Sequence, residues 1–328
     1  MRYILRRFLL LLLTGWVAIT LNFAIPRLMP GNPIEAMAVR YGGKLAPSEL
    51  SALAIELGLK SRQNEVAQYF TYLGHTLTGN LGYSLYSYPE RVSTIIGESL
   101  PWTIFLVGAS TILAFVIGTS LGAIAAWRRG KPLDSALVPT GVMLGATPAF
   151  WIATLALYFL AFRLNLFPVY GGSGINEGLV SFSGIGSIID HAALPGITLT
   201  AISLGGYLLL MRNTTITVLS DDFVKFARAK GLRDRVVATH YAARNAILPN
   251  FTTFALALGF VVSGAIVIEY VFDYPGVGYE LFTAVLNYDY PLMQGLFLII
   301  VIGVLIANFL ADLLYVLLDP RIRMGARS

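Results

Sequence analysis

A chain of 328 residues in which 56% of the residues are hydrophobic and only 12% are charged is too apolar for a water-soluble domain. Its mean hydropathy of +0.71 indicates an integral membrane protein whose solvent is the lipid bilayer. Because the chain has no cysteine, it cannot form disulfides, thiol nucleophiles or Cys-ligated metal sites, and its three histidines are too scattered to suggest a metal site.

The first predicted element is a membrane span at 8–26, which follows a basic N-terminal tip. Its apolar stretch is longer than the core of a signal peptide, and no small-x-small cleavage site follows it. We therefore expect a retained span, with residues 1–29 forming a cytoplasmic tip and the first transmembrane helix.

Residues 30–98 are predicted to form an extracytoplasmic insertion. Within it, the uncharged window 66–89 carries too many polar side chains for a lipid-exposed span. An apolar stripe at helical spacing crosses its first part: Val66, Tyr69, Phe70, Leu73 and Leu77. Such a stripe suits a helix on the bilayer surface, or one that packs against the tips of the chain's own helices, and both interpretations stay open.

Residues 99–318 are predicted to form the transmembrane core, and residues 319–328 a cytoplasmic tail. Five windows in the core lack charged residues over a length that can cross about 30 Å of hydrocarbon: 99–127, 135–162, 191–211, 245–268 and 290–311. With the first span they make an all-α polytopic membrane protein of six transmembrane helices.

The distribution of basic residues supports this topology. If both termini are cytoplasmic, the inside segments hold 16 Lys and Arg residues, whereas the two short outside loops hold only Arg163. A seventh span at 66–89 would move the basic segment between the fourth and fifth spans to the outside. The charge count and the span count therefore agree.

A search for chemistry is mostly negative. The chain has neither a GxxxxGK[ST] phosphate loop nor an HExxH motif. GGSG at 171–174 matches the short pattern of intramembrane serine proteases, but Ser173 falls in a loop and lacks a histidine base deep in a later span. The acidic candidates in the spans are Asp312 and Glu269, too few for the coupling sites of an ion-driven carrier. The energy input is therefore expected to come from outside the membrane portion.

The segment 213–249 is the unusual feature of the core, because it is basic and helix-forming between two long apolar runs. We expect Asp222 to be the N-cap of a short helix that Gly231 ends, and Pro249 to open the fifth span. Attraction to anionic lipid would explain the basic charge alone, but not the accompanying surface of Phe223 and Phe226.

At these residues the sequence resembles the permease subunits of bacterial ABC importers, in the oligopeptide/dipeptide branch. The cytoplasmic EAA-type motif of that family corresponds to Lys225-Phe226-Ala227, Gly231 and Ala246-Ile247-Leu248-Pro249. The first two positions depart from Glu-Ala, and 14 residues separate Gly231 from Ala246. Both departures look like the peptide branch. Further matching segments follow in the expected order: MPGNP (29–33), GNLGYS (79–84), FPVYGG (167–172), YPGVG (274–278), DYPLMQG (289–295) and LLDPRIR (317–323).

The resemblance implies the type I ABC importer permease fold in a bacterial inner membrane. It implies four kinds of partner: a second, similar permease subunit, two cytoplasmic ATPases, an extracytoplasmic substrate-binding protein and the lipid bilayer, with no nucleic acid. ATP and magnesium would bind to the ATPases, and this chain would hold no cofactor and no metal. Oligopeptides or dipeptides are the expected cargo, with oligosaccharides as the alternative.

The residues expected to couple this chain to an ATPase form one short helix and the entry to the fifth span. They are Asp222, Phe223, Val224, Phe226, Ala227, Arg228, Ala229, Lys230, Gly231, Leu248 and Pro249. Aromatic side chains would supply contact area, and Arg228 and Lys230 would orient the partner by charge.

Overall fold

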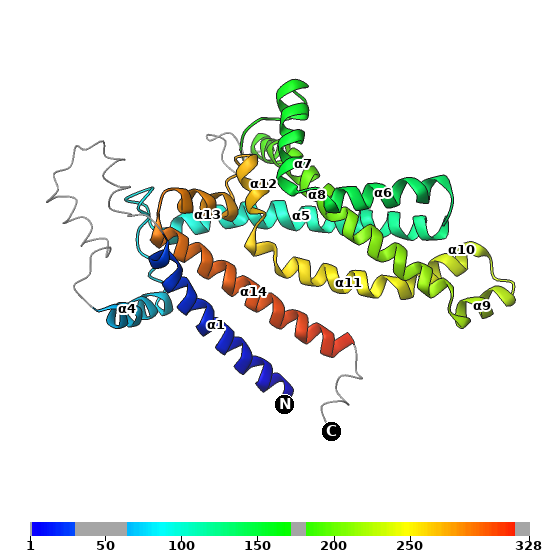
Figure 1. The fold of residues 1–328 in the computed structure, drawn as a ribbon, viewed down its shortest axis with the longest axis horizontal. Helices are drawn as coiled ribbons and strands as arrows, with labels where there is room; N and C mark the ends of the chain where they lie inside the picture. The colour runs from blue at the N-terminus through cyan, green and yellow to red at the C-terminus, as the bar shows by residue number, and fades with distance from the viewer. Residues whose placement is uncertain (1, 30–63, 172–181, 319–328) are drawn as a thin grey trace. The chain divides into compact units, whose positions relative to one another are not determined.

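The computed structural model describes the backbone of residues 2–29, 64–171 and 182–318, and the side chains of 9–29, 64–171 and 186–309. Over these residues the chain is helical, and its β-structure is limited to one isolated bridge between Tyr83 and Arg91. The elements, shown in Figure 1, are α1 (Arg2–Leu28), α4 (Glu65–Leu77), α5 (Val92–Trp127), α6 (Pro132–Ala146), α7 (Ala149–Ala156), η1 (Leu157–Arg163), α8 (Phe182–Leu219), α9 (Asp222–Ala229), α10 (Asp234–Val236), η2 (Val237–Ala243), α11 (Arg244–Gly259), η3 (Val261–Ser263), α12 (Ile266–Val271), α13 (Val277–Leu286) and α14 (Tyr290–Leu318).

The predicted all-α polytopic membrane protein is confirmed, and the described residues hold four to six candidate spans. Four helices of the described chain are long and apolar enough to cross a bilayer unbroken: Leu9–Leu28, Val92–Trp127, Gly186–Leu219 and Tyr290–Phe309. Two bent pairs of helices bring the number to six if each pair is one span: Pro132–Ala146 with Ala149–Arg163, and Asp234–Gly259 with Val261–Val271. In the rejected window 66–89 the only helix of the described residues is α4 without its first residue, and at 13 residues α4 is too short to span.

The window 135–162, expected to hold one span, is a pair of helices that bends by 102° between α6 and α7. Thr147 precedes a proline and has extended backbone, with ψ of 131°. Pro148 follows as the N-cap of α7, so the helix stops and restarts in a new direction. The bend follows from local sequence, although the hydropathy of the window does not reveal it.

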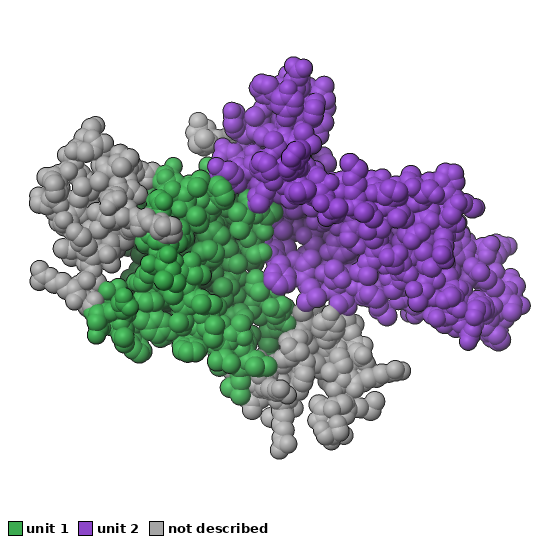
Figure 2. Space-filling view, in the orientation of Figure 1, with its two compact units in different colours: residues 1–103, 262–266, 275–328 green, residues 104–261, 267–274 purple. Residues whose placement is uncertain are grey.

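The described helices fall into two compact units, coloured separately in Figure 2. Unit 1 comprises residues 1–103, 262–266 and 275–328, and unit 2 comprises residues 104–261 and 267–274. In unit 1, α1 runs along α14 and α13 packs on α14 (Figure 1). In unit 2, α8 lies against α6, α7 and α11.

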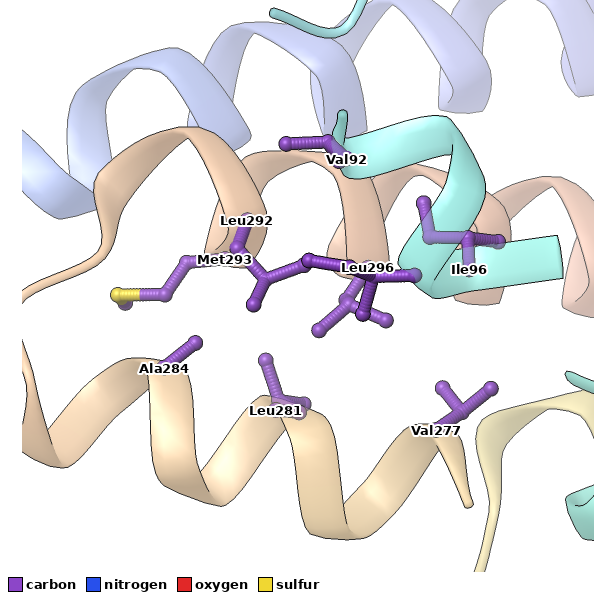
Figure 3. Packing of buried hydrophobic residues seen from close by; sticks show 9 residues of the cluster. Val92, Ile96, Val277, Leu281, Ala284, Leu292, Met293 and Leu296 are labelled. Carbon is purple, nitrogen blue, oxygen red and sulfur yellow. The ribbon is translucent and has the colours of Figure 1, made fainter. Parts of the chain in front are cut away.

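The interior of unit 1 is a layer of aliphatic side chains. Figure 3 shows Leu292, Met293 and Leu296 of α14 facing the buried side of α13, with Val92 and Ile96 at the start of α5 closing one end. Burying such side chains stabilises the unit by about 1.5–3 kcal/mol each. A buried carboxylate, that of Asp289, lies beside this layer. It accepts hydrogen bonds from the Ser84 hydroxyl and from the backbone N–H groups of Tyr86 and Leu292.

Candidate functional site

The basic segment folds as the sequence predicts in outline, but its first helix begins differently. α9 starts at Asp222, so Asp222 is its first helical residue, and Asp221 takes the N-cap position without a side-chain capping bond. The Asp222 carboxylate instead accepts a hydrogen bond from Lys225 Nζ at 2.9 Å, which lowers the pKa of Asp222. The expected N-cap role of Asp222 is therefore wrong. This exposed pair adds little stability because water screens it.

Gly231 ends α9 as expected. Its φ of +76° lies in the left-handed region that favours glycine, and its N–H donates to the Arg228 carbonyl at 2.9 Å. The short helix is therefore bounded on both sides and carries only 8 residues.

The two faces of α9 have different surroundings. Val224 and Ala227 are buried in a small cluster with Val237 of η2. Partly buried side chains surround that cluster: Trp127, Val218, Leu219, Leu232 and Tyr241. Two of the residues expected on a partner-facing surface thus face the chain's own interior. A large residue at Ala227 would disturb this internal packing before it could meet any partner.

The other face of α9 is open and carries aromatic and cationic groups. Phe223 is 41% exposed and Phe226 is 62% exposed. On this face Lys230 Nζ lies 4.7 Å from the centre of the Phe226 ring. The Arg228 guanidinium instead lies over the Trp127 ring, 5.8 Å from its centre, at the edge of the buried cluster. This face, together with exposed Ala229, offers apolar area next to positive charge.

The second half of the segment enters the fifth span without a break. α10, η2 and α11 form one continuous helical run from Asp234 to Gly259, and Pro249 lies inside α11. The expectation that Leu248-Pro249 would open the span is therefore wrong. The preceding turns are π-helical at η2, a form that often marks functional positions in helices. Leu248 is exposed on this run.

Sequence analysis missed Asn250, the residue that follows Pro249. Asn250 is fully buried, and its Nδ2 donates to Thr119 Oγ1 of α5 and to the Tyr207 carbonyl of α8, both at 3.0 Å. One side chain therefore joins the helix that continues the basic segment to two other spans. The only feature of the sequence that could have pointed to Asn250 is its polar carboxamide inside the apolar window 245–268.

Close backbone contacts join the same spans. A Cβ added at Gly118 would lie 2.8 Å from the Leu204 carbonyl oxygen of α8, and one added at Gly122 would overlap the Leu208 carbonyl oxygen. This G-x-x-x-G pair brackets Thr119 and lets α5 approach α8 closely. On α8, a Cβ at Gly205 would overlap the Gly141 carbonyl oxygen of α6.

An ion pair also ties α6 to α8. Arg212 donates to the Asp134 carboxylate from Nε at 2.6 Å and from Nη2 at 3.0 Å. The Gly130 N–H donates to the same carboxylate at 3.0 Å. The pair therefore fixes the turn between α5 and α6 against the end of α8 that leads to α9.

Other predicted sites have a simpler outcome. Residues 172–174 of the GGSG motif lie outside the described residues, as does the side chain of Asp312. Among the residues that the structure describes, no group of three His, Cys, Asp or Glu side chains could hold a metal ion.

Comparison with known proteins gives a consistent result. Residues 118–324 match the family model described as binding-protein-dependent transport system inner membrane component. The chain is 38% identical over 99% of both chains to a Brucella suis protein that bears the provisional name of a peptide permease protein. It is 31% identical to the dipeptide transport system permease protein DppB of Lactococcus lactis, over 98% of this chain and 99% of the relative. It is 34% identical to the dipeptide transport system permease protein DppB of Escherichia coli, over 98% and 99%. The chain belongs to the family of inner-membrane components of binding-protein-dependent transport systems, as a multi-pass permease subunit of an ABC importer.

Proposed function

We propose that this chain forms half of a peptide translocation path and that α9 is the coupling helix that docks into a partner ATPase. The observation that carries the proposal is the division of α9 into two faces. Val224 and Ala227 anchor the helix to its own chain, while Phe223 and Phe226 remain open beside Arg228 and Lys230. Full burial of an aromatic side chain in a partner's groove contributes about 1.5–3 kcal/mol, and the cations orient the encounter.

Movement of α9 has two routes into the spans. The first is packing, because the cluster beneath α9 includes Trp127 at the end of α5 and Leu219 at the end of α8. The second is the continuous helix from Asp234 to Gly259, which carries Asn250 to Thr119 and Tyr207. A push on α9 is thereby delivered to α5, α8 and α11 together.

The proposed assembly contains a second permease subunit, two ATPases on the cytoplasmic side and an extracytoplasmic substrate-binding protein. Both termini then lie in the cytoplasm, as the positive-inside distribution favours. ATP and magnesium bind to the ATPases. Peptides are the proposed cargo because the relatives compared above carry the names of peptide or dipeptide permeases over nearly the whole chain.

The coupling role is tested with Phe226→Ala in the complex reconstituted in liposomes. Because Phe226 is largely exposed in this chain, the variant should keep its thermal stability while its affinity for the ATPase falls about tenfold or more. Peptide-stimulated ATP hydrolysis should fall with it. Val224→Ala is the matched control, because it removes a buried side chain from the same helix and should lower stability instead.

The competing interpretation, a basic patch on anionic lipid, makes the opposite prediction. Neutralising Arg233 and Arg235 would then release the segment from anionic vesicles, while Phe226→Ala would keep full ATPase binding. That pair of results would overturn the coupling role.

The cargo is tested separately by comparing the uptake of a labelled dipeptide with that of a labelled oligosaccharide, each with its binding protein. Uptake of the oligosaccharide alone would overturn the peptide assignment.

A further inference from the structure

α4 is an amphipathic helix with three distinct faces. Asn64 caps it by accepting a hydrogen bond from the Ala67 N–H at 2.9 Å. One face carries Tyr69 and Tyr72, which are partly buried. The stripe expected from the sequence is therefore split, because Tyr69 leaves it for this face while Val66, Phe70 and Leu77 stay exposed.

The tyrosine face is fixed to α1. The Tyr69 hydroxyl lies 2.9 Å from Thr20 Oγ1, and Asn22 Nδ2 donates to the Tyr72 hydroxyl at 3.1 Å. Both rings also contact Phe23, with centroids 5.3 and 5.4 Å from its ring. Three neighbouring positions on a membrane-spanning helix thus fix the position of α4 along the axis of α1.

The exposed apolar side chains form a stripe at helical spacing, which we call the α4 stripe: Val66, Phe70 and Leu77, which are 65%, 63% and 76% exposed. Thr71 and His75 are exposed on the opposite side of the helix, since successive residues turn by about 100°. The two sides of α4 that do not touch α1 therefore have opposite polarity.

The attachment to α1 sets the depth of α4. The span in α1 ends at Leu28, so Thr20 lies eight residues and Phe23 five residues before its end. At a rise of 1.5 Å per residue these positions are about 12 and about 8 Å inside the end of the span. An interfacial helix buries its apolar face about 5–10 Å into the boundary between headgroups and acyl chains. The depth of Phe23 falls within this range, and that of Thr20 lies just beyond it.

We propose that α4 lies in the bilayer interface at the C-terminal end of α1, with the α4 stripe among the lipid acyl chains and Thr71 and His75 toward the water. Lipid is the favoured occupant because α4 is bonded to α1 before the end of its span, at a level where Leu21 and Ile25, on the other side of α1, are themselves exposed. A soluble protein could not reach an apolar surface at that depth without displacing lipid. The inference uses the inner-membrane family assignment and is independent of the coupling role of α9.

The test uses the absence of native cysteine. Phe70→Cys and Thr71→Cys in the full-length chain are each labelled with the environment-sensitive dye NBD and reconstituted with the partner subunits. The vesicles contain phosphatidylcholine and phosphatidylglycerol, with spin-labelled lipid that carries its quencher either near the headgroup or near the chain end. Leu21→Cys on α1 is the positive control.

The expected result is a blue-shifted emission at position 70 that shallow spin label quenches more than deep label, with no quenching at position 71. Val66→Cys should repeat the result and guards against a local effect of the substitution at Phe70. Equal, weak quenching at 66, 70 and 71 would overturn the proposal. Protection of position 70 that appears only when the binding protein is added would also overturn it, in favour of a protein-covered surface.

Discussion

The two compact units differ in which atoms of a neighbouring helix lie against their glycines. In unit 2, a Cβ added at Gly122 or Gly205 would meet main-chain carbonyl oxygens of the neighbouring helix. In unit 1, a Cβ added at Gly295 would meet the Val92 side chain, and one at Gly303 would lie 2.7 Å from the Val262 side chain. At these glycines unit 2 is therefore packed backbone to backbone, whereas unit 1 is packed through side chains. Figure 3 shows the side-chain layer of unit 1.

This difference matters for how each unit can move. Side chains can change rotamer to absorb a small shift, but two main chains in contact can only separate or move together. The unit that carries α9 is the one whose helices touch through their backbones at glycine. That arrangement suits a segment whose proposed role is to transmit a displacement from an ATPase.

The largest expected effect comes from breaking the ion pair of unit 2. Asp134→Ala leaves Arg212, whose side chain is 18% exposed, without its carboxylate. Removal of one partner of a fully buried pair costs about 3–5 kcal/mol, and the partial exposure of Arg212 places the expected loss at the lower end, about 3 kcal/mol. The measurement is unfolding in SDS micelles, followed by circular dichroism. The double variant Asp134→Met/Arg212→Met should recover most of the loss. A single variant as stable as the wild type would show that the pair does not hold α6 to α8.

The glycine contacts give the most direct comparison of the units. Gly122→Ala should lower the free energy of unfolding by about 2–3 kcal/mol, because the new methyl group overlaps backbone that cannot rotate away. Gly295→Ala should cost less, about 1–2 kcal/mol, because the Val92 methyl group can move aside only if this buried, β-branched side chain changes rotamer. Gly206→Ala is the control, because nothing lies within 4 Å of an added Cβ there. Equal losses at 122 and 295 would remove the distinction between the two kinds of packing.

A smaller effect on stability, with a larger one on transport, is expected at Asn250. Asn250→Ala leaves the Thr119 hydroxyl and the Tyr207 carbonyl without this donor, at a cost of about 1–2 kcal/mol. If Asn250 transmits movement, the number of ATP molecules hydrolysed per peptide transported should rise. Thr253→Val is a control on the same helix, since the Thr253 hydroxyl bonds only within α11 to the Pro249 carbonyl. An unchanged ratio in Asn250→Ala would exclude the transmission role.

The smallest effect concerns pH and unit 1. Burial, followed by the charges of Glu90, Asp289 and Glu98, raises the pKa of Glu280 to about 7. The folded chain then binds the proton more tightly than the unfolded chain, so stability falls as pH rises from about 4.5 to about 7. Glu280→Gln should therefore stabilise the protein at pH 8 by about 1 kcal/mol after allowance for solvent screening, and should change little at pH 4.

The pH measurement is a series of thermal unfolding curves in detergent. Glu90→Gln removes one neighbouring carboxylate and should give a smaller gain over the same pH range. A gain from Glu280→Gln that is equal at pH 4 and pH 8 would show that the charge of this group is not its cause.

Features that depend on residues adjacent in the sequence could be predicted from the sequence alone. Six apolar windows predict six spans because the bilayer core fixes the length of a crossing helix. The end of α9 at Gly231 follows from the left-handed backbone that glycine accepts. The motif around Gly231 and Pro249 indicated the permease family, which the comparisons show.

What the sequence could not give were the pairings between distant segments. It did not reveal which face of α9 is buried, since Val224 and Ala227 are covered by residues from α5, α8 and η2. Beyond a polar side chain in an apolar window, it offered no reason to single out Asn250, whose partners Thr119 and Tyr207 lie 131 and 43 positions away. Hydropathy and local propensity sum over adjacent residues, so they determine that helices form and cross the membrane. Only the tertiary structure decides which polar atoms and which backbones of those helices meet.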